Sequence, residues 1–328
     1  MYKVSIIGGS GFVGTNLCRS LLKNGIDFEI LDIKESIQFP EKFKHADVRE
    51  KESLRSALSG DIVVNLAAVH RDDVRNFLDY QKTNIEGAEN LATVCTEKMI
   101  KKIIFTSSVA VYGFATQKTD ENGKINPFNE YGRTKFAAEE IFREWQKQNE
   151  NSLIIVRPTV IFGEGNRGNV YNLLKQVASG RFVMIGSGKN KKSMAYISNI
   201  TEFLHTAIKA DKKYALYNYV DTPDFTMNEL VKLIRFQLTG KEAIGLRLPL
   251  FFGIFIGYLA DLVSSIFGKN LPISSIRVRK FVASSEFISS KANLEGFKPP
   301  YSLKQGLERT LKSEFINPDP SREIFLTE

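Results

Sequence analysis

Short apolar runs alternate with amphipathic helical patterns along the first two thirds of the chain. Apolar runs of strand length between helices are typical of a parallel sheet that helices cover on both faces. The sequence therefore predicts an α/β protein with a doubly wound parallel sheet. The predicted strands cover residues 3–8, 28–31, 62–66, 102–106, 151–157 and 215–219, and the predicted helices cover residues 12–24, 84–98, 169–179 and 199–209.

A glycine-rich turn joins the first predicted strand to the first predicted helix. Gly8, Gly11 and Gly14 follow one another at a spacing of three, with Phe12 and Val13 between the last two. Glycines in this place allow a tight turn and let backbone amides approach a pyrophosphate at the start of a helix. The string alone is weak evidence, but the strand before it and the helix after it supply the required context. We expect a Rossmann-type dinucleotide site here.

Residues at the ends of the next strands fit the rest of a dinucleotide. Asp32 ends the second strand, where a carboxylate accepts hydrogen bonds from the adenosine ribose and repels a 2′-phosphate, which favours NAD over NADP. Its alternative role is a helix or turn cap. Asp47 and Val48 are expected beside the adenine. The strand at 62–66 leads into residues that leave room for the cofactor: Leu66, Ala67 and Ala68.

A tyrosine and a lysine stand four residues apart in the predicted helix that begins near Tyr131 and includes Lys135. This spacing puts both side chains on one helix face, about one turn apart. A phenol has a pKa near ~10, and lowering it toward ~7 takes about 4 kcal/mol, which a fixed lysine and a cationic nicotinamide supply. An ordinary surface pair has the same spacing. Ser108 follows a strand end, where a doubly wound sheet binds ligands, and we expect it in the same crevice.

Composition narrows the class of partner. The 328 residues, 43% of them hydrophobic, are enough for a sizeable core. Cys18 and Cys95 lie in apolar helical patterns, which predicts reduced, buried thiols in a cytosolic protein and neither a disulfide scaffold nor a metal site. The first residues run straight into a strand, without the pattern of a secretion signal. The formal charge of +8 suits an anionic partner, but without a basic stripe interleaved with aromatics we expect no nucleic acid.

Together with the segment Arg157-Pro158-Thr159-Val160-Ile161-Phe162-Gly163, these motifs resemble the extended short-chain dehydrogenase/reductase family of nucleotide-sugar epimerases and dehydratases. The resemblance covers nearly the whole chain. It implies that Ser108 and Tyr131 contact the reacting sugar hydroxyl, that Lys135 holds the nicotinamide ribose and tunes the tyrosine, and that NAD stays bound. It also places Asn84 and Pro158 at the cofactor and Val109 at the substrate.

Three less generic segments are similar to the N-acetylglucosaminyl-diphospho-undecaprenol 4-epimerases, which act on a lipid-linked sugar during bacterial O-antigen assembly. They are Ala68-Val69-His70-Arg71-Asp72-Asp73-Val74, residues 162–172, and Lys192-Ser193-Met194-Ala195-Tyr196. Ordinary UDP-sugar 4-epimerases carry an Arg-Asp pair where this chain has Met194-Ala195, and lysines stand just upstream. This departure puts the usual uridine-diphosphate clamp in doubt. We assign His70 a packing or hydrogen-bonding role, as for most lone loop histidines.

The resemblance implies an NAD-dependent isomerase that converts N-acetylglucosamine to N-acetylgalactosamine on undecaprenyl diphosphate, through a transient 4-keto sugar, for lipopolysaccharide synthesis. The expected substrate contacts are Asn169, Lys192 and Arg279, and a helix cap fits Asn169 equally well. Three alternatives are a soluble UDP-N-acetylglucosamine 4-epimerase, a nucleotide-sugar 4-ketoreductase and a non-catalytic NAD-binding module. The intact Ser-Tyr-Lys set argues against the last.

We expect two domains. Residues 1–166, completed by about 195–220, form the NAD-binding domain, and residues 167–194 and 221–328 form a smaller, mixed but mainly helical substrate lobe. The tail after Asn317-Pro318-Asp319-Pro320 is expected to be loosely held.

The most apolar run in the chain is Leu248–Gly268. Interrupted by Asp261, it is too short to span a bilayer comfortably. As a helix it has one large-apolar side and one small-residue side, and basic residues bracket it, a pattern that suits a helix in the lipid interface. We therefore expect a cytoplasmic protein, peripheral at the inner face of the cell membrane. A helix in the core or in a homodimer interface has the same composition. The large-apolar side comprises Phe252, Phe255, Ile256, Leu259, Val263 and Ile266.

Overall fold

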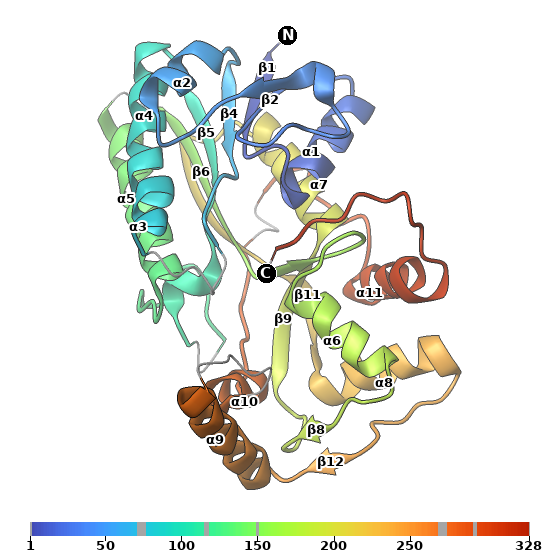
Figure 1. Ribbon diagram of the computed structural model, residues 1–328. Helices are drawn as coiled ribbons and strands as arrows, with labels where there is room; N and C mark the ends of the chain where they lie inside the picture. Colours follow the sequence, from blue (N-terminus) through green and yellow to red (C-terminus); the bar gives the residue numbers. More distant parts are fainter. Residues whose placement is uncertain are drawn as a thin grey trace.

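The computed structural model describes residues 2–70, 77–114, 118–148, 151–267, 274–290 and 294–327. Residues 71–74 of one segment used for the resemblance above lie outside these ranges, as does Gly268 at the end of the apolar run. The chain forms a large parallel sheet with helices on both faces and a smaller lobe below it (Figure 1).

Seven parallel strands form the large sheet, and each neighbouring pair has parallel register. The strands form where the sequence is continuously apolar, as at Leu153–Val156, because both faces of the sheet are covered. The fold class predicted from the sequence is confirmed. In spatial order the strands are β3 (Phe43–His45), β2 (Asp27–Asp32), β1 (Lys3–Ile7), β4 (Ile62–Asn65), β5 (Lys102–Thr106), β6 (Ser152–Pro158) and β10 (Tyr214–Tyr219).

Two layers of helices enclose this sheet, and each layer has its own hydrophobic core (Figure 1). One layer contains α2 (Lys51–Ala57), α3 (Phe77–Tyr80), the π-helix η2 (Gln81–Glu86), α4 (Gly87–Glu97) and α5 (Glu130–Gln148). The other contains α1 (Phe12–Lys23) and α7 (Ile197–Lys209). Short 3-10 turns lie at η1 (Pro40–Lys42) and η3 (Val109–Tyr112).

The smaller lobe is built on a three-stranded sheet of β11 (Asp221–Thr226), β9 (Lys191–Tyr196) and β7 (Val160–Phe162). The sequence pattern predicted mainly helices after residue 221 and missed β11, whose residues DTPDFT alternate poorly and include a proline. Helices α6 (Asn169–Ala178), α8 (Met227–Thr239) and α11 (Leu303–Leu311) pack around this sheet, and η5 (Lys312–Ile316) follows. Strands β8 (Met184–Ile185) and β12 (Arg247–Leu248) pair beside α9 (Leu250–Phe267) and α10 (Ser275–Val282).

The C-terminal tail is ordered against the body of the protein, so the prediction of a loose tail is wrong. Phe325 forms a β-bridge with Asn166, and its ring centroid lies 5.6 Å from that of Phe12. The prolines before residue 321 suggested a free end, but the Phe325 ring packs on Phe12 of α1.

Candidate active site

The predicted dinucleotide turn lies where the sheet order reverses, between β1 and β4, at the carboxyl ends of the strands. In doubly wound sheets this is the place where ligands bind. Gly8 has φ +77°, and a Cβ on it would lie 2.7 Å from the backbone nitrogen of Ala67. A Cβ on Gly14 would lie 2.5 Å from Gly9 Cα. A side chain at Gly8 or Gly14 would therefore clash with neighbouring backbone atoms. The turn leads through Gly11, the N-cap residue, into α1. This cradle fits a pyrophosphate.

Asp32 holds its carboxylate beside this turn. Its Oδ2 accepts a hydrogen bond from Ser10 N at 3.0 Å, and its Oδ1 accepts one from Lys34 N at 3.0 Å. Both expected roles are therefore compatible, because the side chain caps a local turn and still lies where an adenosine ribose is recognised. The assignment to the ribose stays a prediction.

Asp47 and Val48 follow β3 near the far edge of the crevice. The Asp47 carboxylate binds the Arg49 guanidinium, with Nε to Oδ1 at 2.9 Å, and this pairing lowers the pKa of Asp47. The Val48 carbonyl accepts a hydrogen bond from Asn90 at 3.0 Å. Because the Asp47 carboxylate is engaged by Arg49, we expect the backbone and the Val48 side chain to form the adenine edge.

Asn84 clamps the segment after β4 against α5. Its Oδ1 accepts from Val69 N at 2.9 Å, and its Nδ2 donates to Val69 O and to Thr134 Oγ1, each at 3.0 Å. The clamp fixes Ala67 and Ala68 next to the helix that carries the tyrosine and the lysine. The predicted role of Asn84 at the cofactor stays a prediction.

Tyr131 and Ser108 come from elements that pack directly on each other. Ser108 caps η3, where its side chain accepts from Ala110 N at 3.1 Å. A Cβ on Gly132 would lie 2.5 Å from Ala110 O, so only glycine lets α5 approach η3 this closely. Asn129 Oδ1 accepts a hydrogen bond from Gly132 N at 2.9 Å, which stabilises the start of α5 at this position. The structure thus packs the element that carries the predicted serine directly on the helix that carries the predicted tyrosine.

Lys135 lies on the buried face of α5, only 2% exposed. Its ammonium lies 4.3 Å from the centroid of the Phe105 ring on β5. Burial lowers the pKa of Lys135 to about 7, although the charge of Glu139 acts in the opposite direction. A lysine in this environment changes its charge near neutral pH, which suits a group that tunes a neighbouring phenol.

A buried ion pair behind Lys135 was not predicted from the sequence. Glu139 is fully buried and accepts from Arg157 Nε at 2.8 Å, from Arg157 Nη2 at 2.5 Å and from Ser107 Oγ at 2.5 Å. Arg157 also donates to Tyr112 Oη at 2.6 Å. The pair ties β5, α5 and β6 together next to the reacting residues. The sequence did contain a signal for the position of Glu139, because this residue continues the four-residue spacing from Tyr131 and Lys135 on the same helix face.

The predicted substrate residues are spread over the smaller lobe and its border. Lys192 is half-buried and donates to the carbonyls of Lys280 and Ala283, at 2.9 and 2.5 Å, near the end of α10. Arg279 donates to Tyr258 Oη of α9 at 2.9 Å. Val109 lies in η3 and Asn169 at the start of α6. Pro158, which was predicted at the cofactor, is the last residue of β6.

Asn169 is exposed and is the first residue inside α6, whose N-cap residue is Gly168. The alternative role of Asn169 as a helix cap is therefore wrong. Lys192 already donates to two carbonyls, so its role toward a substrate stays a prediction, like those of Val109, Asn169 and Arg279. The role of Pro158 at the cofactor also stays a prediction.

Comparisons with known proteins identify the family and the fold. Residues 4–219 match the NAD dependent epimerase/dehydratase family. The chain is 47% identical, over 99% of both chains, to the N-acetyl-alpha-D-glucosaminyl-diphospho-ditrans,octacis-undecaprenol 4-epimerase of Escherichia coli O157:H7. It is 27% identical to the UDP-glucose 4-epimerase of Vibrio cholerae, over 94% of each chain. The UDP-N-acetylglucosamine 4-epimerase of Bacillus cereus has the same fold, with a TM-score of 0.75 at 19% identity, over 95% of this chain and 98% of the other.

Proposed function

The chain belongs to the NAD dependent epimerase/dehydratase family, and we propose that it inverts C4 of N-acetylglucosamine carried on undecaprenyl diphosphate, giving N-acetylgalactosamine. The observation that carries the proposal is the 47% identity, over the full length of both chains, to an enzyme named for that reaction. The close packing of η3, which Ser108 caps, on α5, which carries Tyr131 and Lys135, supports it. The product would serve lipopolysaccharide or O-antigen synthesis.

Each residue of the site has a distinct part in the reaction. Tyr131, as phenolate, removes the proton of the C4 hydroxyl, and Ser108 holds the same oxygen by a hydrogen bond. Lys135 stabilises the phenolate by its positive charge. Bound NAD would supply reversible hydride transfer at C4, by way of a 4-keto sugar, and the turn of Gly8, Gly11 and Gly14 would hold it. Tyr131 then gives the proton back, so that no net oxidation occurs.

The sugar must turn over between the two hydride transfers. Firm binding of the diphosphate together with loose binding of the sugar permits this turn. Arg279 lies where α9 meets α10 and is exposed, which suits a contact with the diphosphate of a carrier that arrives along α9.

The carrier is tested by comparing two substrates that share the same sugar. We expect turnover of N-acetylglucosaminyl-diphospho-undecaprenol in detergent to exceed that of UDP-N-acetylglucosamine by about 100-fold in kcat/KM, since the polyprenyl chain contributes apolar binding that uridine cannot. Sugars released by mild acid are separated by chromatography. Faster turnover of the UDP-sugar would contradict the lipid carrier and favour the nucleotide-sugar alternative. Stoichiometric consumption of NADH would instead indicate a ketoreductase.

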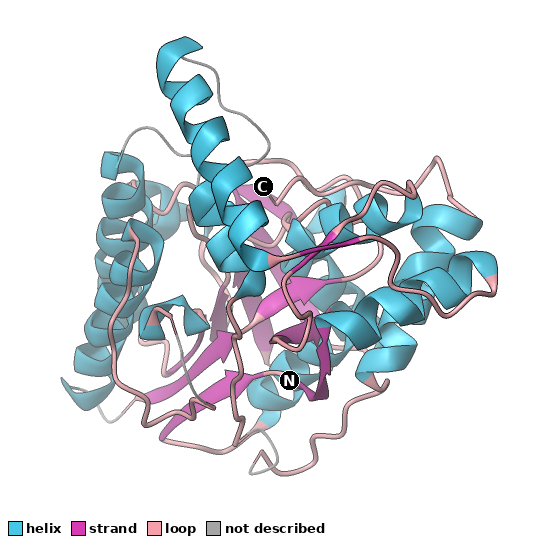
Figure 2. Cartoon of the chain, turned by 90° about the horizontal axis from the view of Figure 1, so that it is seen from below, coloured by secondary structure: helices cyan, strands magenta, loops and turns pink. Residues whose placement is uncertain are grey.

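Helix α9 exposes a wide apolar surface. In Figure 2 it stands out from the body of the molecule. The small-residue side faces inward: a Cβ on Gly253 would lie 2.5 Å from Ile185, and one on Gly257 would lie 2.7 Å from Ser275 Cα. This orientation excludes the core alternative for α9 within this chain. The large side chains turn outward, with these exposed fractions: Phe251 65%, Phe252 50%, Phe255 60%, Ile256 43%, Leu259 47%, Leu262 58% and Val263 42%.

We propose that this surface docks on the inner leaflet of the cell membrane. Among the described residues, no helix is both long and apolar enough to cross a bilayer. Exposed Arg277 and Arg279 on α10 and Arg247 before α9 flank the apolar side chains. An apolar face with a basic rim matches anionic lipid headgroups. Docking there would bring the site close to a substrate that is itself held in the bilayer.

Flotation with liposomes tests this docking surface. We expect the protein to float with vesicles that contain phosphatidylglycerol at low salt. The double substitution Phe255→Asp with Leu262→Asp should reduce the bound fraction about tenfold or more. Two apolar side chains that contact the lipid are lost, and the new carboxylates are repelled by the anionic headgroups. Ile37→Asp is the matched control, since Ile37 is 76% exposed on the other domain. Equal flotation of both variants, or no binding by the wild-type protein, would contradict membrane docking.

A further inference from the structure

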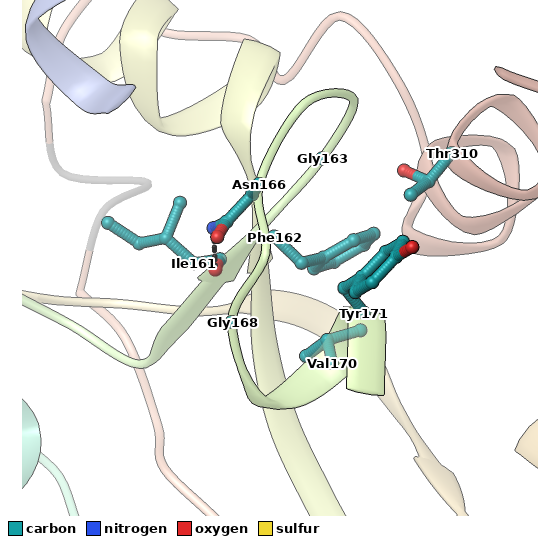
Figure 3. A pocket seen from close by; sticks show the side chains of 8 residues that line it. All are labelled: Ile161, Phe162, Gly163, Asn166, Gly168, Val170, Tyr171 and Thr310. Atoms are coloured by element: carbon teal, nitrogen blue, oxygen red, sulfur yellow. Dashed lines mark hydrogen bonds between the residues drawn. The ribbon is translucent and has the colours of Figure 1, made fainter. Parts of the chain in front are cut away.

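The last residues of the chain pair with a loop of the smaller lobe. Phe325 N donates to Gly165 O, and Arg167 N donates to Phe325 O, both at 2.9 Å. Thr327 Oγ1 donates to Asn166 Oδ1 at 2.5 Å. Figure 3 shows Asn166 in this loop, with its amide hydrogen-bonded to Ile161 O at 3.0 Å. The side chain of Asn166 thus connects the tail to β7.

The loop is shaped to receive the tail. Gly165 has φ +86°, and a Cβ on it would lie 2.8 Å from Glu323 O. A Cβ on Gly168 would lie 2.6 Å from Thr327 Oγ1. Side chains at either glycine would push the tail away. Two glycines at these positions indicate a built contact, in which the tail fits closely along the loop.

The same tail also touches the dinucleotide domain at three points along the crevice. Gln38 Nε2, six residues beyond Asp32, donates to Glu323 at 2.7 Å. The Phe325 ring packs on Phe12, which begins α1 directly after the glycine turn. His70 Nε2, in the segment after β4, lies 3.1 Å from Thr327 O. The contacts therefore link the tail to the loop after β2, to the start of α1 and to the segment after β4.

We infer that residues 322–327 form a strap that holds NAD in its site between catalytic cycles. A dinucleotide that leaves a doubly wound sheet must pass the carboxyl ends of the strands, and the tail contacts Phe12 at the start of α1, directly after the glycine turn at this edge. An epimerase returns its cofactor to the starting oxidation state in every cycle, so retention carries no penalty and protects the reduced form. The strap rests on NAD binding alone and is independent of which sugar or carrier the enzyme accepts.

The release rate of NAD tests the strap without any sugar present. Purified full-length protein is loaded with radiolabelled NAD, chased with excess unlabelled NAD and filtered over time. Phe325→Ala removes the aromatic contact with Phe12, and we expect release about tenfold faster. Thr327→Val removes one hydrogen bond at nearly constant shape, and we expect release about threefold faster.

Leu326→Ala is the matched control, because Leu326 lies between these two residues but is 73% exposed. Its release rate should stay within about twofold of wild type. Melting temperatures of the cofactor-free proteins identify a folding defect. If Phe325→Ala has such a defect, the NAD release rate of Thr327→Val is the result that tests the strap. Wild-type release rates in both variants would overturn the strap. Loss of epimerase activity with unchanged NAD release would also contradict it, while leaving the proposed reaction intact.

Discussion

A Tyr131→Phe protein is expected to lose about 10³-fold in kcat while it retains its NAD, since positioned acid–base groups contribute roughly 10²–10⁴-fold. Phenylalanine keeps the ring and its packing but has no oxygen to take the C4 proton. The packing of Gly132 on Ala110, which brings α5 to Ser108, is not altered by this change. The activity is measured by the conversion of lipid-linked N-acetylglucosamine, and the bound NAD by its absorbance after heat release.

Tyr214→Phe is a suitable control, because Tyr214 is 45% exposed and its hydroxyl accepts a surface hydrogen bond from Arg143, at 3.1 Å. Its kcat should stay within about twofold of wild type. Near-normal turnover by Tyr131→Phe would exclude Tyr131 as the base. Loss of NAD from that variant would mean that the phenol acts mainly in cofactor binding.

Replacing Glu139 with glutamine is expected to lower the free energy of unfolding by about 3–5 kcal/mol, the usual cost of removing one partner of a buried ion pair. The guanidinium of Arg157 would remain buried without the carboxylate that it binds at 2.5 and 2.8 Å. Since the charge of Glu139 raises the pKa of Lys135 against the effect of burial, its loss also lowers that pKa further. The lysine would then carry less charge at neutral pH.

The neighbouring Glu140→Gln variant is the matched control, because it removes the same charge from an exposed position on the same helix. Glu140 binds Arg143 at the surface, where its side chain is 55% exposed. Because surface pairs contribute little, we expect a change of about 0.5 kcal/mol or less. Urea denaturation monitored by circular dichroism gives both values. Equal stabilities of the two variants would show that the Glu139–Arg157 pair is not the anchor between β6 and α5.

The sheet and the cofactor turn were predictable because each depends on local pattern. Apolar runs such as 153–156 are buried on both faces, and the glycines at 8 and 14 are needed wherever the backbone packs this closely. The relation of Tyr131 to Lys135 also followed from helix geometry alone.

The features that sequence reasoning missed depend on contacts between distant segments. Glu139 and Arg157 are 18 positions apart, and either could have been a surface charge. The tail contact of Phe325 with Phe12 joins the two ends of the chain. The pattern of α9 showed two sides but not which side faces the protein, because that depends on Ile185 and Ser275 from other elements.

The fate of the hydrogen at C4 tests the central claim most directly. Wild-type enzyme is incubated with lipid-linked N-acetylglucosamine that carries deuterium at C4, and the product sugar is examined by mass spectrometry. If Tyr131 takes only the hydroxyl proton and the hydride passes to NAD and back, the N-acetylgalactosamine retains the deuterium at C4. Deuterium lost to water, or product sugar formed without label, would contradict the account.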